Sequence, residues 1–319
     1  MVQPLESREF DTQRLLTEHP PVWQHPNKVA VYDSLCPAGS RQSGRLRYSR
    51  WPTLPLPERI DVTASLERVQ ARPGFYDYAP RSTRADAVEW HVNFADPHLF
   101  VAYGSRLFAQ DEMQVAEHPA LGSLKEALEA AGSVTLTVER GLPTPILVAG
   151  VERRGRIDTT GLYGNAFARA PVDAVRRATT RLDPPTITNL IAIAAPTGDG
   201  RYTSGQIEHI LKTAASGFRA AVIDSSEQIG SAAPVVVHSG FWGCGAFGGN
   251  RVLMLLLQIA AAGAAGLAQL VLHTGEGGEE NFKNACRTLA QVGDSPCSPS
   301  DLIARVSGLG FEWGESDGN

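Results

Sequence analysis

Residues 238–250 read H-S-G-F-W-G-C-G-A-F-G-G-N, and this glycine-rich stretch decides the fold prediction. It follows the β-branched run 235–237, and a long apolar segment begins directly after it at Arg251. A strand, a glycine loop and a helix in this order let backbone N–H groups close around a phosphate. Only glycine adopts the required φ values at several successive positions. We therefore predict an anion-binding loop between a strand and a helix.

The loop also carries large aromatic side chains. Its residues 243–248 satisfy the pattern G-x-G-x-x-G, which is a weak signal by itself, and a turn that merely packs tightly is the alternative interpretation. Phe241, Trp242 and Phe247 lie beside the glycines. Aromatic rings next to bare backbone favour a planar or sugar-bearing ligand over an idle turn.

The overall composition excludes several classes of protein. The chain has 319 residues, 43% of them hydrophobic, which suffices for one large domain, and its net charge of −5 gives no general attraction to nucleic acid. Two local clusters of arginine, at 41–50 and 153–156, are interpreted as solvated loops. Four cysteines without C-x-x-C spacing indicate neither a disulfide framework nor a structural zinc site.

One segment, residues 252–272, is uncharged over a length that could span a membrane. Gln258 and Gln269 interrupt it, and Gly263 and Gly266 divide it. We instead predict a helix over 251–265, a glycine stop and a buried strand over 267–272. The N-terminus lacks the basic start and apolar core of a secretory signal, so a cytoplasmic protein is expected.

The chain divides into three regions. Residues 1–57 are rich in proline and predict an extended arm or partly disordered sequence. Residues 58–310 are expected to form the main domain, and the acidic tail 311–319 is expected to be frayed. Strand-like runs lie at 87–94, 134–138, 146–151, 186–193, 235–237 and 267–272. Helical patterns lie at 107–118, 123–131, 202–218, 279–292 and 300–306.

These strands and helices alternate along the chain. The clearest helix, 202–218, begins with a capping box formed by Thr203 and Gln206. Alternating strands and helices predict an α/β domain with a largely buried, mixed sheet.

A second group of functional residues, Gln110-Asp111-Glu112, lies in the first turn of the predicted helix 107–118. Its plain explanation is that acidic residues interact favourably with a helix N-terminus, by about 0.3–1 kcal/mol. The chemistry open to such a pair is glycosidic: a carboxyl group protonates a leaving oxygen and then helps a water attack the oxocarbenium-like centre. A helix N-terminus lowers a carboxyl pKa, whereas a carboxylate neighbour and a bound diphosphate raise it. A general-acid role for Glu112 therefore requires Asp111 and the ligand together.

Taken together, the two groups resemble the macrodomain family, specifically its poly(ADP-ribose) glycohydrolase branch. That branch carries D-F-A-N at the end of a strand, a G-G-G loop, Q-E-E on a helix and, later, G-N-W-G-C-G-A-F-G-G-D. The corresponding residues here are 93–96 (N-F-A-D), 110–112 (Q-D-E) and 240–250 (G-F-W-G-C-G-A-F-G-G-N). The resemblance runs from about residue 87 to about residue 272. It implies a three-layer α/β/α sandwich with a mixed central sheet, preceded by the N-terminal extension.

The resemblance also implies roles for individual residues. Glu112 would be the catalytic acid at the distal ribose, Asp111 would hold ribose hydroxyls, and Gln110 would support the pair. The glycine loop would bind the diphosphate through backbone N–H groups, and the Phe247 ring would flank the distal ribose. Tyr163 is the candidate for stacking on adenine. The full set of expected ligand-binding residues is Phe94, Asp96, Tyr163, Gly243, Gly245, Ala246, Phe247 and Gly248. No metal and no cofactor are implied.

The chain departs from the family pattern at several positions. Phe100-Val101-Ala102 stands where the family has G-G-G, Asp96 and Phe241 replace asparagines, and Asp111 replaces a glutamate. Side chains in place of the three glycines would narrow the approach to the distal ribose and the diphosphate. These changes favour mono-ADP-ribosylated targets over poly(ADP-ribose) chains.

The predicted function is therefore an ADP-ribosyl glycohydrolase. The target bond is an ester to a protein carboxylate, a ribose–ribose link or a link to a nucleic-acid base, and the sequence does not choose among them. The arginines at 41–50 would support nucleic acid if they bordered the pocket. A non-catalytic ADP-ribose reader is the main alternative. A thiol enzyme using Cys244 and His238 lacks a visible orienting partner, and a nicotinamide oxidoreductase lacks the acidic residue expected about 20 positions after its glycine loop.

Overall fold

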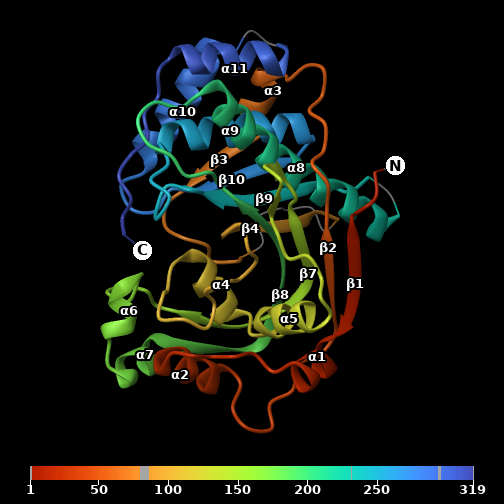
Figure 1. The fold of residues 1–319 in the computed structure, drawn as a ribbon, viewed down its shortest axis with the longest axis vertical. Helices are drawn as coiled ribbons and strands as arrows, with labels where there is room; N and C mark the ends of the chain where they lie inside the picture. The colour runs from red at the N-terminus through yellow and green to blue at the C-terminus, as the bar shows by residue number, and fades with distance from the viewer. Residues whose placement is uncertain (1, 80–85, 231, 294–295, 319) are drawn as a thin grey trace.

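The computed structural model describes residues 2–79, 86–230, 232–293 and 296–318, and its centre is an eight-stranded sheet in the order β1-β2-β7-β8-β4-β9-β10-β3 (Figure 1). The strands of this sheet are β1 (Glu6–Asp11), β2 (Arg45–Arg50), β3 (Val69–Arg72), β4 (Val88–Ala95), β7 (Ile146–Ile157), β8 (Thr179–Ala194), β9 (Val235–Gly240) and β10 (Gln269–His273). A separate two-stranded sheet pairs β5 (Val138–Glu139) with β6 (Leu142–Pro143).

Helices connect and cover these strands. They are α1 (Thr12–Glu18), α2 (Pro26–Leu35), α3 (Val62–Glu67), α4 (Gln110–Glu117), α5 (Ala120–Ala130), α6 (Asn165–Arg169), α7 (Val172–Ala178), α8 (Ser204–Ile229), α9 (Arg251–Ala265), α10 (Glu279–Val292) and α11 (Pro299–Gly308).

The sheet is mixed, as the sequence predicts. The pairs from β8 through β4, β9 and β10 to β3 are parallel, whereas the pairs from β1 through β2 and β7 to β8 are antiparallel. The carboxyl ends of β4, β9 and β10 therefore meet at one edge of the sheet. Crevices at this edge are the usual ligand sites of open α/β sheets.

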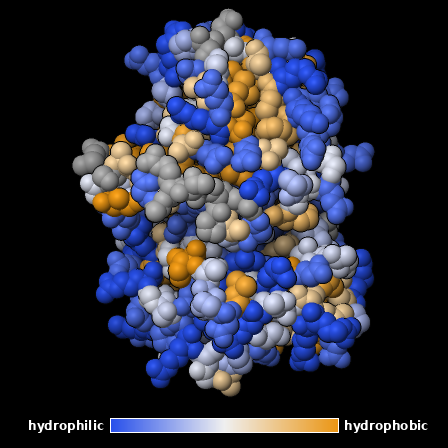
Figure 2. Space-filling view, turned by 180° about the vertical axis from the view of Figure 1, so that it is seen from behind, coloured by the Kyte–Doolittle hydropathy of each residue, from blue (hydrophilic) through white to orange (hydrophobic). Residues whose placement is uncertain are grey.

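Helices lie on both faces of the sheet, which confirms the α/β/α architecture (Figure 1). Side chains of β4 alternate between the faces: Trp90 and Val92 join the large core under α8 and α9, whereas Ala95 joins the core under α4 and α5. Seen from behind, the surface is mostly hydrophilic, with hydrophobic side chains gathered in a strip in the upper half (Figure 2).

The apolar segment 252–272 folds as predicted. Helix α9 ends at Ala265, Gly266 adopts φ +75°, and the buried strand β10 follows. Within the part of the chain that the structure describes, no helix combines the length and apolar character that crossing a membrane requires.

The N-terminal region differs from its prediction as an extended or partly disordered arm. Strands β1 and β2 extend the central sheet, and α1 and α2 pack onto the domain. Polar residues hide the strand pattern, because Arg47 and Arg50 of β2 are paired with Asp224 and Glu139. The domain boundaries themselves stay a prediction.

The predicted strand 134–138 is also largely wrong. Only Val138 is in a strand, and the preceding residues form loop contacts, including a hydrogen bond from the Leu99 N–H to the Thr135 carbonyl.

Candidate active site

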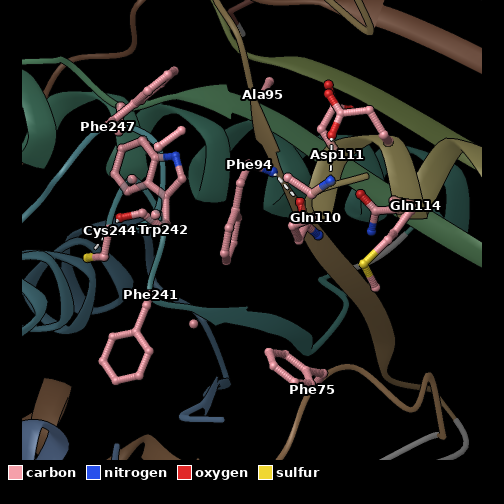
Figure 3. Close-up of a pocket in the computed structure, with 18 of the residues that line it drawn as sticks. Phe75, Phe94, Ala95, Gln110, Asp111, Gln114, Phe241, Trp242, Cys244 and Phe247 are labelled. Atoms are coloured by element: carbon pink, nitrogen blue, oxygen red, sulfur yellow. Dashed lines mark hydrogen bonds between the residues drawn. The ribbon is translucent and has the colours of Figure 1, made fainter. Parts of the chain in front are cut away.

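A cavity of about 420 Å³ opens where β4 and β9 end, between two walls (Figure 3). One wall is the glycine loop (residues 241–250) between β9 and α9, and the other is the acid-pair loop (residues 96–109) together with the start of α4. Ten of the predicted site residues line the cavity: Phe94, Asp96, Gln110, Asp111, Glu112, Tyr163, Gly243, Gly245, Ala246 and Phe247. Gly248 does not.

Gln110 fixes the first turn of α4 against strand β4. Its side-chain Oε1 accepts a hydrogen bond from the Phe94 N–H at 2.8 Å, and its Nε2 donates to the Val92 carbonyl at 3.2 Å. Both bonds go to the last residues of β4, so the helix start cannot shift along the strand without losing them. This placement agrees with the supporting role implied for Gln110.

Asp111 and Glu112 are both buried, with relative exposures of 6% and 4%. The Glu112 carboxylate accepts from the Ala109 N–H at 3.0 Å, and Asp111 Oδ1 accepts from Asn93 Nδ2 at 2.9 Å. Burial, followed by the neighbouring Glu112 carboxylate, raises the pKa of Asp111 well above its usual range. The raised pKa favours the protonated form of the Asp111 carboxyl. The sequence assigns the acid to Glu112, whereas the raised pKa in the free protein is that of Asp111.

Asn93 contacts the acid pair directly, a position that the sequence analysis missed. Its buried amide donates to Gln114 Oε1 at 2.9 Å as well as to Asp111, and Gln114 Nε2 donates to the Tyr78 hydroxyl at 3.2 Å. Strand alternation could have found it, because Trp90 and Val92 face the opposite core. Asn93 orients the acid pair from the strand side.

Lys28 is a second missed residue, and it comes from the N-terminal helix α2. Lys28 is 1% exposed, and its ammonium group donates to the Tyr103 carbonyl at 2.7 Å and lies 5.1 Å from the centre of the Phe108 ring. Burial lowers the pKa of Lys28 to about 8, against the attraction of Glu112 and Asp111. No local pattern identifies such a residue, because it lies more than 80 positions before the acid pair.

The glycine loop presents free backbone donors to the cavity. Its own bonds run from Cys244 N–H to the Phe241 carbonyl (3.0 Å), from Gly248 N–H to Gly245 (3.0 Å) and from Gly249 N–H to Gly243 (2.8 Å). Among the described residues, the N–H groups of Gly245, Ala246 and Phe247 have no hydrogen-bond acceptor. Three consecutive free donors in front of α9 form a site suited to an anion.

Glycine is required at Gly243. This residue adopts φ +74°, and a Cβ there would lie 2.4 Å from the Ala195 Cβ. The Gly248 N–H is used inside the loop, so this residue supports the turn rather than the cavity.

Trp242 and Cys244 of the glycine loop contribute to the structure of the loop. Trp242 is fully buried, and its indole N–H donates to the Ile193 carbonyl at 3.0 Å, which fastens the loop to β8.

The Cys244 thiol is not activated as a nucleophile. Burial raises its pKa to about 12. The ring nitrogens of His238 contact Glu89 Oε2 (2.9 Å) and His273 Nε2 (3.2 Å) instead of Cys244. The thiol-enzyme alternative therefore finds no support in the structure.

The acid-pair loop is shaped by residues far away in sequence. Phe100 is buried with φ +52°, a left-handed conformation at a position where the resemblance has glycine. Val101 and Ala102 line the cavity. The Gly104 carbonyl accepts hydrogen bonds from the N–H groups of Gln24 and His25. The N-terminal region thus forms the back of this wall.

The arginine clusters are solvated only in part: Arg41, Arg45 and Arg156 are exposed, whereas others are buried. Arg153 and Arg154 lie on β7 in buried ion pairs with Glu117 (2.8 Å) and Glu152 (2.9 Å). Strand β2 lies next to the edge strand β1, with two strands between it and β4, and none of its arginines lines the cavity. In the described ranges, no group of three or more His, Cys, Asp or Glu side chains is arranged to hold a metal ion.

The acidic tail is docked rather than frayed. The Gly314 N–H donates to the Gly248 carbonyl at 2.7 Å, and the Asp317 N–H donates to the Gly245 carbonyl at 3.4 Å. Asp317 lines the cavity together with the glycine loop. Acidic composition predicts exposure, but the open backbone carbonyls of the glycine loop offer this tail partners.

Comparison with known proteins gives a match at the level of a family model. The model of poly(ADP-ribose) glycohydrolase, with the macro domain fold, matches residues 145–280. Residues 145–280, less than half of the chain, therefore resemble the macro domain of a poly(ADP-ribose) glycohydrolase. The resemblance inferred from the motifs is thereby confirmed. The matched residues run from β7 to the start of α10 and include the glycine loop, whereas the acid pair lies before them.

Solved structures also resemble this chain. The poly(ADP-ribose) glycohydrolase of Thermomonospora curvata bound to the inhibitor ADP-HPD is 16% identical, with 83% of this chain and 99% of that chain covered and a TM-score of 0.48. The enzyme of Deinococcus radiodurans in complex with ADP-ribose is 14% identical, with 89% and 94% covered and a TM-score of 0.43. No curated protein matches the sequence significantly.

Proposed function

We propose that this protein is an ADP-ribosyl glycohydrolase. The observation that carries the proposal is the opposition, across one cavity, of three free backbone N–H groups and a buried pair of carboxyl groups, Asp111 and Glu112. The first suits a diphosphate, and the second suits protonation of a glycosidic oxygen. The family model that matches residues 145–280 describes a glycohydrolase, in agreement with the prediction of an enzyme.

In this proposal each wall has its own task. The N–H groups of Gly245, Ala246 and Phe247 bind the diphosphate, and the Phe247 ring flanks the distal ribose. Asp111 holds ribose hydroxyls, and Glu112 donates a proton to the leaving oxygen as the bond to the anomeric carbon breaks. A water then attacks that carbon and gives its proton back to the Glu112 carboxylate.

The remaining predicted contacts surround these two groups. Phe94 lies between the walls (Figure 3). Asp96 follows the end of β4, and its carboxylate accepts from the His98 N–H at 2.9 Å. Tyr163 lines the cavity within reach of the Glu112 charge and stays our candidate for stacking on adenine. Gly248 supports the loop from outside the cavity.

We propose a mono-ADP-ribosylated protein, joined through an ester to an acidic side chain, as the substrate. Val101 and Ala102 place side chains on the cavity wall where the family has glycines, which disfavours long poly(ADP-ribose) chains. An ADP-ribosylated nucleic acid is the alternative target, and no arginine of β2 lines the cavity to support it. A cytoplasmic location stays a prediction.

The test is the release of free ADP-ribose from a protein mono-ADP-ribosylated on acidic side chains. Glu112→Gln is expected to slow release by about 10²- to 10⁴-fold, the usual contribution of general acid catalysis. Binding of ADP-ribose, measured by calorimetry, should persist in this variant. Glu129→Gln on the neighbouring helix α5 is the matched control, because Glu129 is an exposed residue outside the cavity.

Each other outcome has a defined meaning. Equal release by wild type and Glu112→Gln would keep the enzyme and discard Glu112 as its acid. Binding without release from either protein or nucleic acid would identify a reader module. Absence of ADP-ribose binding would remove both functions.

A further inference from the structure

The C-terminal segment (residues 312–318) lies across the glycine loop. The Asn250 side chain donates to the Glu312 carbonyl at 3.0 Å, and backbone bonds join Gly314 to Gly248 and Asp317 to Gly245. Asn165 of α6 donates to the Gly318 carbonyl at 2.9 Å, so the segment reaches the far side of the cavity. Figure 1 shows the chain end lying between the upper helices and α6.

The tip of this segment places a carboxylate where the proposed diphosphate would bind. Asp317 Oδ2 lies 3.1 Å from the position that a Cβ on Gly245 would occupy. The charge of Asp317 also acts on Tyr163, another residue that lines the cavity: the pKa of Tyr163 is raised to about 12, first by burial, then by Asp317 and then by Glu112. An anionic ligand on the loop would meet both steric overlap and like charge at this point.

The two ends of the segment are held very differently. At its root, the Trp313 ring stacks on Tyr202 at 4.1 Å, and the Trp313 N–H donates to the Gly200 carbonyl at 2.8 Å. A Cβ on Gly198 would lie 2.5 Å from Trp313, so this glycine makes room for the indole. By contrast, residues 314–318 are exposed, and the bond from Asp317 to Gly245 is long at 3.4 Å. Because the tip is exposed and the root is packed against Tyr202 and Gly198, the tip can leave the loop while the fold stays intact.

We propose that residues 314–318 are an internal competitor of the diphosphate, with Asp317 as the competing anion. In the free protein the tip covers the glycine loop, and the ligand binds when the tip moves away while Trp313 stays docked. The proposal rests on the proposed function, because it assigns the diphosphate to this loop. The measured affinity is then the intrinsic affinity reduced by the fraction of molecules whose loop is uncovered.

The test is calorimetric titration of the full-length protein with ADP-ribose. Asp317→Asn is expected to bind three- to tenfold more tightly than wild type, since the like charge is removed. Trp313→Ala, which releases the root without changing the charge, should show a gain of the same order. Glu315→Gln is the matched control: it removes the same charge from the same segment, yet Glu315 does not line the cavity. Its affinity should stay within twofold of wild type, and adenosine, which has no diphosphate, should bind all variants equally.

Movement of the tip has its own readout. Saturating ADP-ribose should speed cleavage after Glu315 by a glutamate-specific protease at least threefold, because the uncovered tip is more accessible. Equal affinity of Asp317→Asn and wild type, or slower cleavage in the presence of ligand, would overturn the competitor while leaving the glycohydrolase in place. If neither wild type nor any variant binds ADP-ribose, the proposed function fails and the competitor fails with it.

Discussion

The two walls of the cavity are built in different ways. The glycine loop is held by bonds between its own residues and by Asn250, whose side chain accepts from the N–H groups of Val252 and Leu253 at the start of α9. The acid-pair loop is held by segments far from it in sequence, through Gln24, His25 and Lys28. The glycine loop is therefore held by residues close to it in the sequence, and the acid-pair loop is held by residues distant from it in the sequence. This difference predicts how each wall responds to substitution.

The largest expected effect is on ligand binding at the glycine loop. Gly245→Val should reduce ADP-ribose affinity at least 100-fold, because the side chain fills the place of the diphosphate and of Asp317. Gly245 has no positive φ, so thermal stability should stay close to that of wild type. Calorimetry and a melting curve check both statements. Unchanged affinity would show that this loop is not the diphosphate site.

A next, smaller effect is expected on the stability of the acid-pair loop. A Cβ on Gly104 would lie 2.2 Å from the Val22 carbonyl oxygen, so Gly104→Ala must push the N-terminal region away. We expect a loss of about 2–3 kcal/mol in the free energy of unfolding, measured in urea, as for other overpacked sites. Gly205→Ala in α8 is the control, since a Cβ there meets only Thr203 at 4.0 Å. A loss no larger than that of the control would mean that the N-terminal region does not hold this wall.

The acid-pair wall should also make the free energy of unfolding depend on pH, which the glycine loop should not. Because the pKa of Asp111 is raised on folding, the unfolded chain ionises first, and the free energy of unfolding falls as the pH rises from about 4 through neutrality. Asp111→Asn removes this contribution. We expect the free energy of unfolding of the variant to rise relative to that of wild type between acidic and neutral pH, by at least about 1.4 kcal/mol, the value of one pKa unit. Parallel pH profiles of the two proteins in urea unfolding would contradict the raised pKa.

The smallest effect is expected at the cap of α9. Asn250→Ala removes an N-cap that accepts two N–H groups and should cost about 1 kcal/mol in unfolding free energy. Asn250→Asp keeps the cap and is the control. If both substitutions cost the same, the contact of Asn250 with the Glu312 carbonyl, rather than the cap, would be the stabilising feature.

The sequence by itself determined the elements whose signals are local. The order of strand, glycine loop and helix at 235–265, the glycine stop at Gly266 and the capping box at Thr203 depend on φ preferences and spacing within a few residues, and the structure places them as predicted. The same holds for the position of Gln110, Asp111 and Glu112 in one helical turn.

Only the tertiary structure decided what lies around these elements. Lys28 interacts electrostatically with the acid pair, and Asn93 donates a hydrogen bond to Asp111. The tail covers the glycine loop. Each of these contacts joins residues that are far apart in the sequence. Strand β2 was hidden because its arginines find their partners on α8 and β5. The physical reason is common to these cases. Burial, desolvation and charge pairing depend on which distant groups meet, and that information is absent from the spacing of residues along the chain.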